Sequence, residues 1–120
     1  SPVALAVARL ALALGQRGYP VVAYALEPTQ VTVAFTTGIT ATFPLDLLAD
    51  HLTAVDAVTR ALERHGIAPT KTEFRRPVEV DKRTLDYWLF LRCITAVRQQ
   101  QPFVAQHPVE LQRRQKPPRR

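Results

Sequence analysis

The chain has 120 residues, of which 47% are hydrophobic and 22% are charged, a balance typical of a globular domain with a core of its own. Its single Cys excludes an intrachain disulfide framework and an all-cysteine metal site. The longest apolar run, Val3 to Leu14, has 12 residues and contains Arg9, whereas a transmembrane helix needs about 20. We therefore expect no membrane association and a cytoplasmic location.

The net charge of +6 is unevenly distributed. Residues 1–66 carry four Arg against five acids, a net of −1, and residues 67–120 carry twelve Lys and Arg against five acids, a net of +7. The last eight residues, 113–120, hold five basic side chains and no acid. Such asymmetry predicts a polyanionic partner, most commonly nucleic acid.

The first predicted element is a helix over Val3 to Leu14, which is nearly all Ala, Leu and Val. Pro2 suits its first position, with Ser1 as the cap. Two apolar stripes follow at helical spacing: Val3, Val7, Leu10 and Leu14 on one side, and Leu5, Ala8 and Leu12 on the other. We expect the sheet to cover one stripe, and either the C-terminal helix or a second copy of the chain to cover the other.

A three-stranded antiparallel meander is predicted between Tyr19 and Phe43. Its first strand, Val21 to Leu26, is apolar on both faces. In the next two strands, period-two alternation assigns one set to the core: Val31, Val33, Phe35, Ile39, Ala41 and Phe43. The opposite face is polar, and we expect it to be solvated: Gln30, Thr32, Thr36, Thr40 and Thr42. Pro28 and Gly38 favour the two intervening turns.

The segment from Leu45 to His65 is predicted to be helical, in two pieces. Asp46 is expected to cap the first piece, and Thr53 to Asp56, which resembles a capping box, is expected to start the second. Val55, Val58 and Leu62 form its predicted core stripe, and Gly66 followed by Ile67 is typical of a helix C-terminus.

The order helix, three strands, helix is similar to that of the double-stranded RNA-binding domain. That family carries a lysine cluster at the start of its second helix, where this chain has Asp46, Asp50 and Asp56. The similarity is confined to element order, and no functional residue is assigned from it.

The C-terminal half begins with a polar, basic segment, Thr70 to Val80, predicted to be a loop or an edge strand because it contains Pro77. Asp81 is expected to cap a third, apolar helix from Lys82 to about Gln100. Four prolines are mixed with Gln and Arg beyond Gln101, which predicts an extended tail. We therefore expect an α+β fold, with one domain over residues 1–101 and a basic tail over 102–120.

No catalytic motif, cofactor signature or metal-ligand spacing is present. Asp46 and Asp50 beside His51 would suit a metal or acid–base pair, but acids in the first turns of a helix are better explained by its dipole. Cys93 lies in an apolar helical stretch and is interpreted as an inert buried thiol. A small enzyme is the least favoured class.

The basic residues carry the functional hypothesis. They form three clusters: Lys71, Arg75 and Arg76; Lys82 and Arg83; and Arg113, Arg114, Lys116, Arg119 and Arg120. Phosphate contacts need only cations at suitable spacing, so we expect a non-enzymatic nucleic-acid-binding or accessory protein. The alternative is a dimeric protein–protein adaptor or chaperone-like module, in which Val3 to Leu14 forms the dimer interface and the tail binds an acidic protein.

Overall fold

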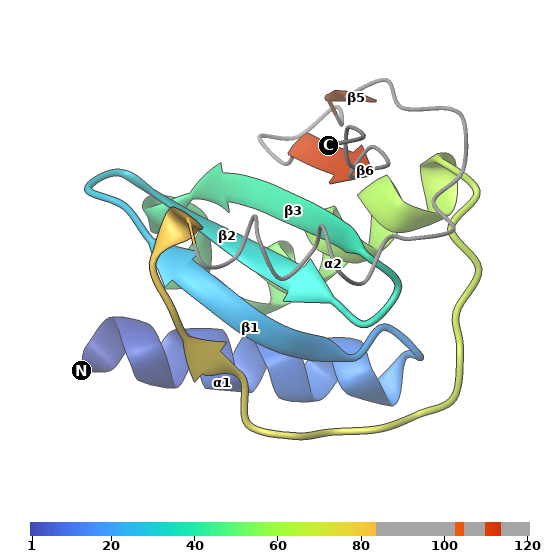
Figure 1. Ribbon diagram of the computed structural model, residues 1–120, viewed down its shortest axis with the longest axis horizontal. Helices are drawn as coiled ribbons and strands as arrows, with labels where there is room; N and C mark the ends of the chain where they lie inside the picture. The colour runs from blue at the N-terminus through green and yellow to red at the C-terminus, as the bar shows by residue number, and fades with distance from the viewer. Residues whose placement is uncertain (84–102, 105–109, 114–120) are drawn as a thin grey trace, which may run out of the picture.

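The structure, a computed structural model, describes residues 1–83, 103–104 and 110–113 of the chain. Two α-helices lie on one face of a mixed sheet that is mainly antiparallel (Figure 1). The strand order is β4-β1-β2-β3-β6-β5. The predicted α+β class is confirmed. The predicted third helix beyond Arg83 and most of the predicted tail lie outside the described residues.

Helix α1 spans Pro2–Gln16. The Ser1 hydroxyl accepts a hydrogen bond from the Ala4 amide at 3.4 Å, so the predicted cap is confirmed. The stripe that packs on the sheet is also as predicted: Val7, Leu10 and Leu14 are buried. This burial supplies most of the stability of a helix in a small domain, because helical propensity alone is a weak force.

Strands β1 (Val21–Leu26), β2 (Gln30–Phe35) and β3 (Ile39–Pro44) form the predicted antiparallel meander. β1 also pairs in parallel with the short edge strand β4 (Val78–Glu79). Beyond β3 lie β6 (Glu110–Arg113) and then β5 (Phe103–Val104). The β2–β3 turn uses Gly38 at a φ of 86°, a conformation that favours glycine.

The core lies between the sheet and the two helices. Phe35 and Phe43 are its largest fully buried side chains, and they belong to the face predicted from alternation. A β-bulge shifts the register of β1 between Val21, opposite Phe35, and Ala23, opposite Ala34. Because a bulge inserts one extra residue, Val21 and Tyr24 both belong to this core, while Val22 contributes to the opposite face.

The prediction of a solvated threonine face is wrong for its central residues. Thr32 and Thr40 are buried, and Ala34 on the same face is fully buried. The hydroxyl groups of Thr32 and Thr42 lie 2.9 Å apart and hydrogen-bond across the strands. Threonine tolerates this burial because its methyl group packs like a hydrocarbon and its hydroxyl has a cross-strand partner.

After β3 the chain forms a 3-10 helix, η1 (Leu45–Ala49), and then helix α2 (His51–Arg64). The predicted break is confirmed, but its capping residues are different. Asp50 caps α2 by accepting a hydrogen bond from the Thr53 amide at 3.1 Å, and Asp46 makes no capping hydrogen bond. The end of α2 is as predicted, since the Ile67 amide donates to the Leu62 carbonyl at 3.0 Å.

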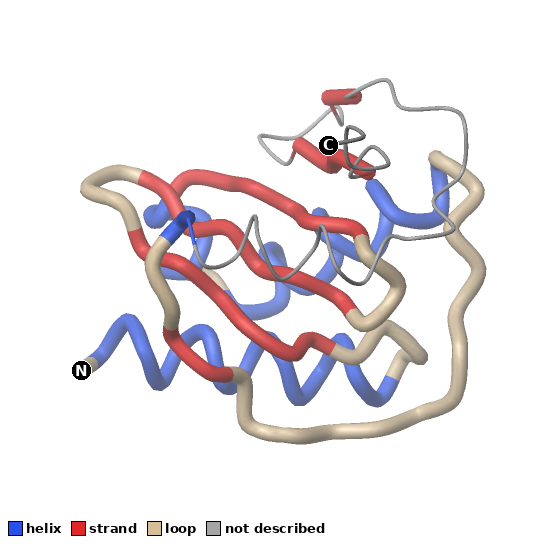
Figure 2. Tube along the Cα trace, viewed as in Figure 1, coloured by secondary structure: helices blue, strands red, loops and turns tan. Residues whose placement is uncertain are grey.

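The segment after α2 passes around one end of the molecule and returns beside α1 to reach the sheet edge (Figure 2). Hydrogen bonds to the C-terminal end of α1 fix its path: the Thr70 amide donates to the Gly18 carbonyl at 2.7 Å, and the Glu73 amide to the Gly15 carbonyl at 3.2 Å. Pro77 then precedes β4, so the edge-strand prediction is confirmed for residues 78–79.

Candidate interaction surface

The outer side of α1 carries an exposed apolar stripe, hereafter the α1 stripe, made of Leu5, Ala8 and Leu12. Leu5 is 64% exposed and Leu12 is 42% exposed, although both are large hydrophobic residues. They are two helical turns apart, with Ala8 between them, so they line up on one side of the helix. The stripe was predicted to need a cover, and within the described part of the chain its leucines remain open to solvent.

An open groove of about 590 Å³ adjoins this stripe. The N-terminal half of α1 forms one wall, and the segment that leads into β4 forms the other. Its lining is mostly apolar, with a tyrosine and an arginine as polar members: Pro2, Ala4, Leu5, Ala8, Tyr24, Arg76 and Pro77, with Ser1 at the helix start. An apolar groove with a few polar groups is the usual form of a ligand or peptide site.

Tyr24 links this groove to the sheet edge. Its hydroxyl donates a hydrogen bond to the Glu79 carboxylate of β4 at 3.4 Å. Burial raises the pKa of Tyr24 above its ordinary value, the Glu79 carboxylate raises it further, and the Arg76 guanidinium acts in the opposite direction. The three side chains therefore form one electrostatic group beside the groove, in which Arg76 supplies the positive charge.

The close packing of the segment against α1 depends on Gly15. A Cβ at this position would collide with the Glu73 carbonyl oxygen and approach the Phe74 Cα at 3.6 Å. A glycine is thus required for the approach of the two backbones and not for an unusual dihedral angle. This approach holds the segment against the C-terminal end of α1, and Arg76, three residues after Glu73, lines the groove beside Leu5 and Ala8.

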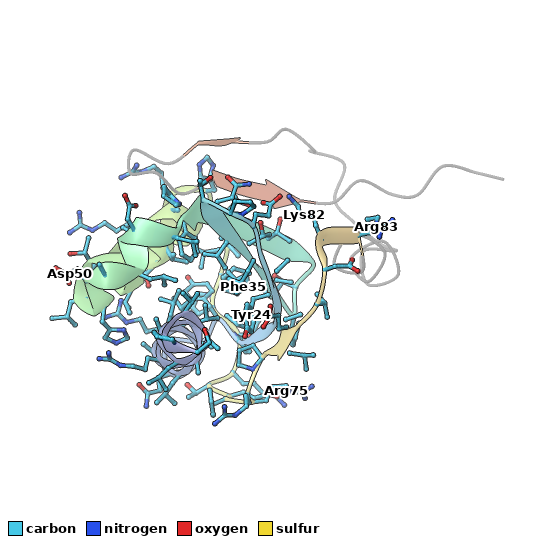
Figure 3. All side chains as sticks on the ribbon, turned by 90° about the vertical axis from the view of Figure 1, so that its left-hand side faces the viewer. Tyr24, Phe35, Asp50, Arg75, Lys82 and Arg83 are labelled. Carbon is cyan, nitrogen blue, oxygen red and sulfur yellow. The ribbon has the colours of Figure 1, made fainter. Side chains whose placement is uncertain are left out.

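Several cations predicted to contact nucleic acid are paired within the chain. The Glu73 carboxylate forms ion pairs with Lys71 Nζ at 3.8 Å and with Arg75 Nη2 at 3.4 Å, and Lys82 Nζ lies 3.6 Å from the Glu27 carboxylate. Among the described residues, Arg76 and Arg83 are exposed and have no carboxylate within ion-pair distance. Arg75, Lys82 and Arg83 project from the same side of the molecule (Figure 3).

The one described member of the third basic cluster, Arg113, lies away from the first two clusters. Arg113 is the last residue of β6 and pairs with Ile39 of β3, so its backbone lies on the opposite side of the meander from β4. Arg114, Lys116, Arg119 and Arg120 lie outside the described residues. Residues 1–83 hold nine Lys and Arg against eight acids, a net of only +1, so most of the basic excess belongs to the rest of the chain.

A second groove, of about 610 Å³, lies between the end of α1 and the end of α2. Three of its polar side chains, those of Arg17, Thr59 and Tyr19, already have hydrogen-bond partners within the chain. Arg17 Nη1 donates to the Thr59 hydroxyl at 3.1 Å and lies 3.6 Å from the Asp56 carboxylate, and the Tyr19 hydroxyl donates to the Ile67 carbonyl at 3.0 Å. These contacts join α1 to α2, and we interpret this region as structural.

The acids considered for chemistry have local roles. Asp50 caps α2, and the hydrogen bond from the Thr53 amide lowers its pKa. Within residues 1–83, 103–104 and 110–113, no three His, Cys, Asp or Glu side chains gather in a way that would hold a metal ion. Cys93 lies outside this part of the chain. No helix in the part that the structure describes has the length and apolar character to cross a bilayer.

Sequence reasoning identified the α1 stripe but missed the groove beside it. The stripe is visible from helical spacing, whereas Tyr24, Arg76 and Glu79 come together only through the parallel pairing of β4 with β1. No local signal in the sequence indicates that pairing.

Searches against protein-family models, curated proteins and solved structures find no match to this chain. The residues of the surface itself are therefore the basis for a functional proposal.

Proposed function

We propose that this chain is a non-enzymatic protein-interaction module that binds a partner protein through the α1 stripe. The observation that carries this proposal is the exposure of Leu5 and Leu12 on a helix whose opposite side is already packed in the core. Single exposed leucines are ordinary, but a line of them beside an apolar groove marks a binding surface.

Covering the α1 stripe would remove apolar surface from water. Full burial of a leucine side chain is worth about 1.5–3 kcal/mol, so two leucines and the groove between α1 and β4 offer a substantial gain to any protein that covers them. Nothing else in the local sequence requires leucine at these positions, since alanine favours an exposed helix at least as well.

Selection from a displayed library of random 18-residue peptides tests the proposal. The purified full-length chain serves as bait, and the variant Leu5→Asp with Leu12→Asp serves for counter-selection. A third bait, Leu52→Asp, is the matched control, because Leu52 is 70% exposed but lies on α2. Circular dichroism must first show that all three proteins are folded.

We expect enriched peptides to carry an apolar stripe and to bind the unmodified chain and the Leu52→Asp variant equally well. They should not bind the variant that combines Leu5→Asp with Leu12→Asp. Enriched peptides that bind all three baits equally would show that the α1 stripe is not the binding surface. A selection that yields no enriched peptide would also contradict the proposal.

A second candidate function, nucleic-acid binding, is favoured by a different observation. Residues 113–120 combine five cations with no acid, and phosphate contacts require only cations at suitable spacing. Lys71, Arg75 and Lys82 pair with carboxylates, which reduces the positive charge that these residues can offer to phosphate groups. Oligonucleotide titration at several salt concentrations tests this function.

A further inference from the structure

The charges that border the α1 stripe are predominantly positive. α1 contains Arg9 and no acid, and the first acid of the chain is Glu27. Arg9 is exposed and lies four residues after Leu5 and three before Leu12, so it neighbours both leucines on the helix surface. On the other side of Leu5, Arg76 lines the groove.

The acids near this surface do not cancel that charge. Glu73 is shared between Lys71 and Arg75, so this group of three side chains has a net charge of +1. Glu79 keeps its negative charge, because its hydrogen-bond partner Tyr24 is neutral, but Glu79 is not among the residues that line the groove, whereas Arg76 is. Arg9 and Arg76 thus flank an apolar strip formed by Leu5, Ala8 and the groove, with positive charge on each side of it.

The shape of the strip fits a helix. Leucines two turns apart match the spacing of apolar residues along one side of an amphipathic helix. Ala8, at the centre, has a short side chain that leaves room for a larger partner residue. An amphipathic helix laid along α1 would place its flanking residues above Arg9 on one side and Arg76 on the other.

A second copy of the chain fits less well. In a two-fold symmetric pair, the same surface patch meets itself. An antiparallel crossing at Ala8 would bring Leu5 of one copy near Leu12 of the other, but it would also bring the two Arg9 guanidinium groups together at the centre. Like charges in direct opposition disfavour that pairing.

We propose that the partner is an amphipathic helix whose apolar stripe is flanked by Asp or Glu, with Arg9 and Arg76 pairing with its carboxylates on the two sides of the α1 stripe. This inference rests on the proposed interaction function and specifies the chemistry of the partner. Electrostatic complementarity of this kind chiefly sets specificity and orientation, while the leucines supply the apolar contact.

The test uses two labelled 18-residue helical peptides with the same leucine stripe, one flanked by Glu and the other by Lys, titrated against the full-length chain by fluorescence anisotropy. We expect the Glu-flanked peptide to bind more tightly, with a preference that falls as salt rises. The double variant Arg9→Glu with Arg76→Glu should bind the Glu-flanked peptide about tenfold more weakly at low salt and should prefer the Lys-flanked peptide. Arg60→Glu, on the exposed side of α2, is the matched charge control and should change neither affinity.

Equal affinity for both peptides, a preference for the Lys-flanked peptide, or binding of neither would overturn the inference. The library could instead yield peptides that have uncharged flanks and require Leu5 and Leu12 for binding. Such peptides would overturn the proposal of an acidic partner and leave the interaction function intact. Sedimentation equilibrium provides a separate check. A dimer of the unmodified chain that Leu5→Asp with Leu12→Asp converts to a monomer would identify the occupant as a second copy.

Discussion

The hydroxyl of Tyr24 donates a hydrogen bond to the carboxylate of Glu79 at 3.4 Å, and this contact joins β1 to the edge strand β4. β4 has only two residues, and both are exposed. It therefore depends on such cross-links, together with the hydrogen bond from the Val80 amide to the Tyr24 carbonyl at 2.9 Å. Because Arg76 precedes β4 by two residues, the contact also helps to position the guanidinium beside the groove.

Titration of Tyr24 provides the first prediction. Burial, and then the Glu79 carboxylate, raise its pKa above the ordinary value, and Arg76 lowers it. The folded protein therefore favours the neutral phenol. Its contribution to stability is fully present below the unfolded pKa of about 10 and is lost as the pH rises through the folded pKa.

Glu79→Gln should lower the pKa of Tyr24, and Arg76→Gln should raise it further. Ultraviolet difference spectra over an alkaline titration measure both shifts, with Tyr24→Phe identifying the signal among the three tyrosines. Identical titration curves for the two variants would contradict the proposed electrostatic group.

The two phenylalanines Phe35 and Phe74 provide a test of the core. Phe35 is 2% exposed and Phe74 is 47% exposed. Phe35→Ala should reduce the free energy of unfolding by about 3–5 kcal/mol, the usual cost of truncating a buried aromatic residue. Phe74→Ala should cost much less, because the side chain keeps about half of its contact with water. Denaturant melts compare the two, and similar midpoints would contradict the assigned core.

The strands could be predicted because period-two alternation specifies which residues share a face of a sheet. Val31, Val33 and Phe35 accordingly lie in the core. The same pattern does not specify whether the opposite face is covered. Alternation therefore predicts that Thr32 faces solvent, whereas Thr32 is buried and its hydroxyl hydrogen-bonds to that of Thr42.

The helix break after η1 shows a second limit. Asp46, Asp50 and Thr53 are all residue types that cap helices, and they lie within eight residues. Sequence preference alone does not decide among them, because the choice depends on where the chain leaves β3 and how α2 meets the core. Similarly, the groove requires pairing between β1 and β4, which are separated in the chain by β2, β3, η1, α2 and a long loop.

The cap of α2 gives a prediction about acid stability. The hydrogen bond from the Thr53 amide lowers the pKa of Asp50. A carboxyl group with a lowered folded pKa contributes stability above its unfolded pKa of about 3.9 and loses it as the pH falls through the folded value. Asp50→Ala should therefore lower the melting temperature at neutral pH and have a smaller effect in acid.

Asp50→Asn should retain most of the melting temperature at neutral pH, because asparagine caps helices as well as aspartate does. Asp46→Ala is the control, since Asp46 makes no capping hydrogen bond. Equal effects of Asp50→Ala and Asp46→Ala in thermal melts would contradict the assignment of Asp50 as the cap.

Gly15 offers a test of the contact between α1 and the segment leading to β4. Replacing a helical glycine with alanine is normally stabilising by about 0.5–1 kcal/mol. Here the new Cβ would collide with the Glu73 carbonyl, so we expect Gly15→Ala to destabilise the fold by about 1–3 kcal/mol, as overpacking does. Gln16→Ala, at the exposed next position of α1, is the control and should change little. A stabilised Gly15→Ala variant would show that the segment lies elsewhere.

The final prediction concerns the second candidate function. If the basic residues bind nucleic acid, affinity for a duplex oligonucleotide should fall steeply with salt, with a log–log slope of about −0.9 for each phosphate contact. Deleting residues 113–120 removes five cations and should make the slope shallower by up to about four units. Charge reversal at Arg75 and Arg76 should weaken binding about equally for all oligonucleotide sequences, because phosphate contacts carry no information about the bases.

The ion pairs around Glu73 sharpen this test. Glu73 neutralises part of the charge of Lys71 and Arg75, so Glu73→Gln should free both cations and strengthen binding to the oligonucleotide at low salt. Under the protein-interaction function alone, the same variant has no effect on oligonucleotides, because none bind at moderate salt. Absence of any mobility shift for the full-length chain at about 50 mM salt, where electrostatic attraction is weakly screened, would eliminate the nucleic-acid function. The protein-interaction function, with the α1 stripe as its binding surface, would then remain.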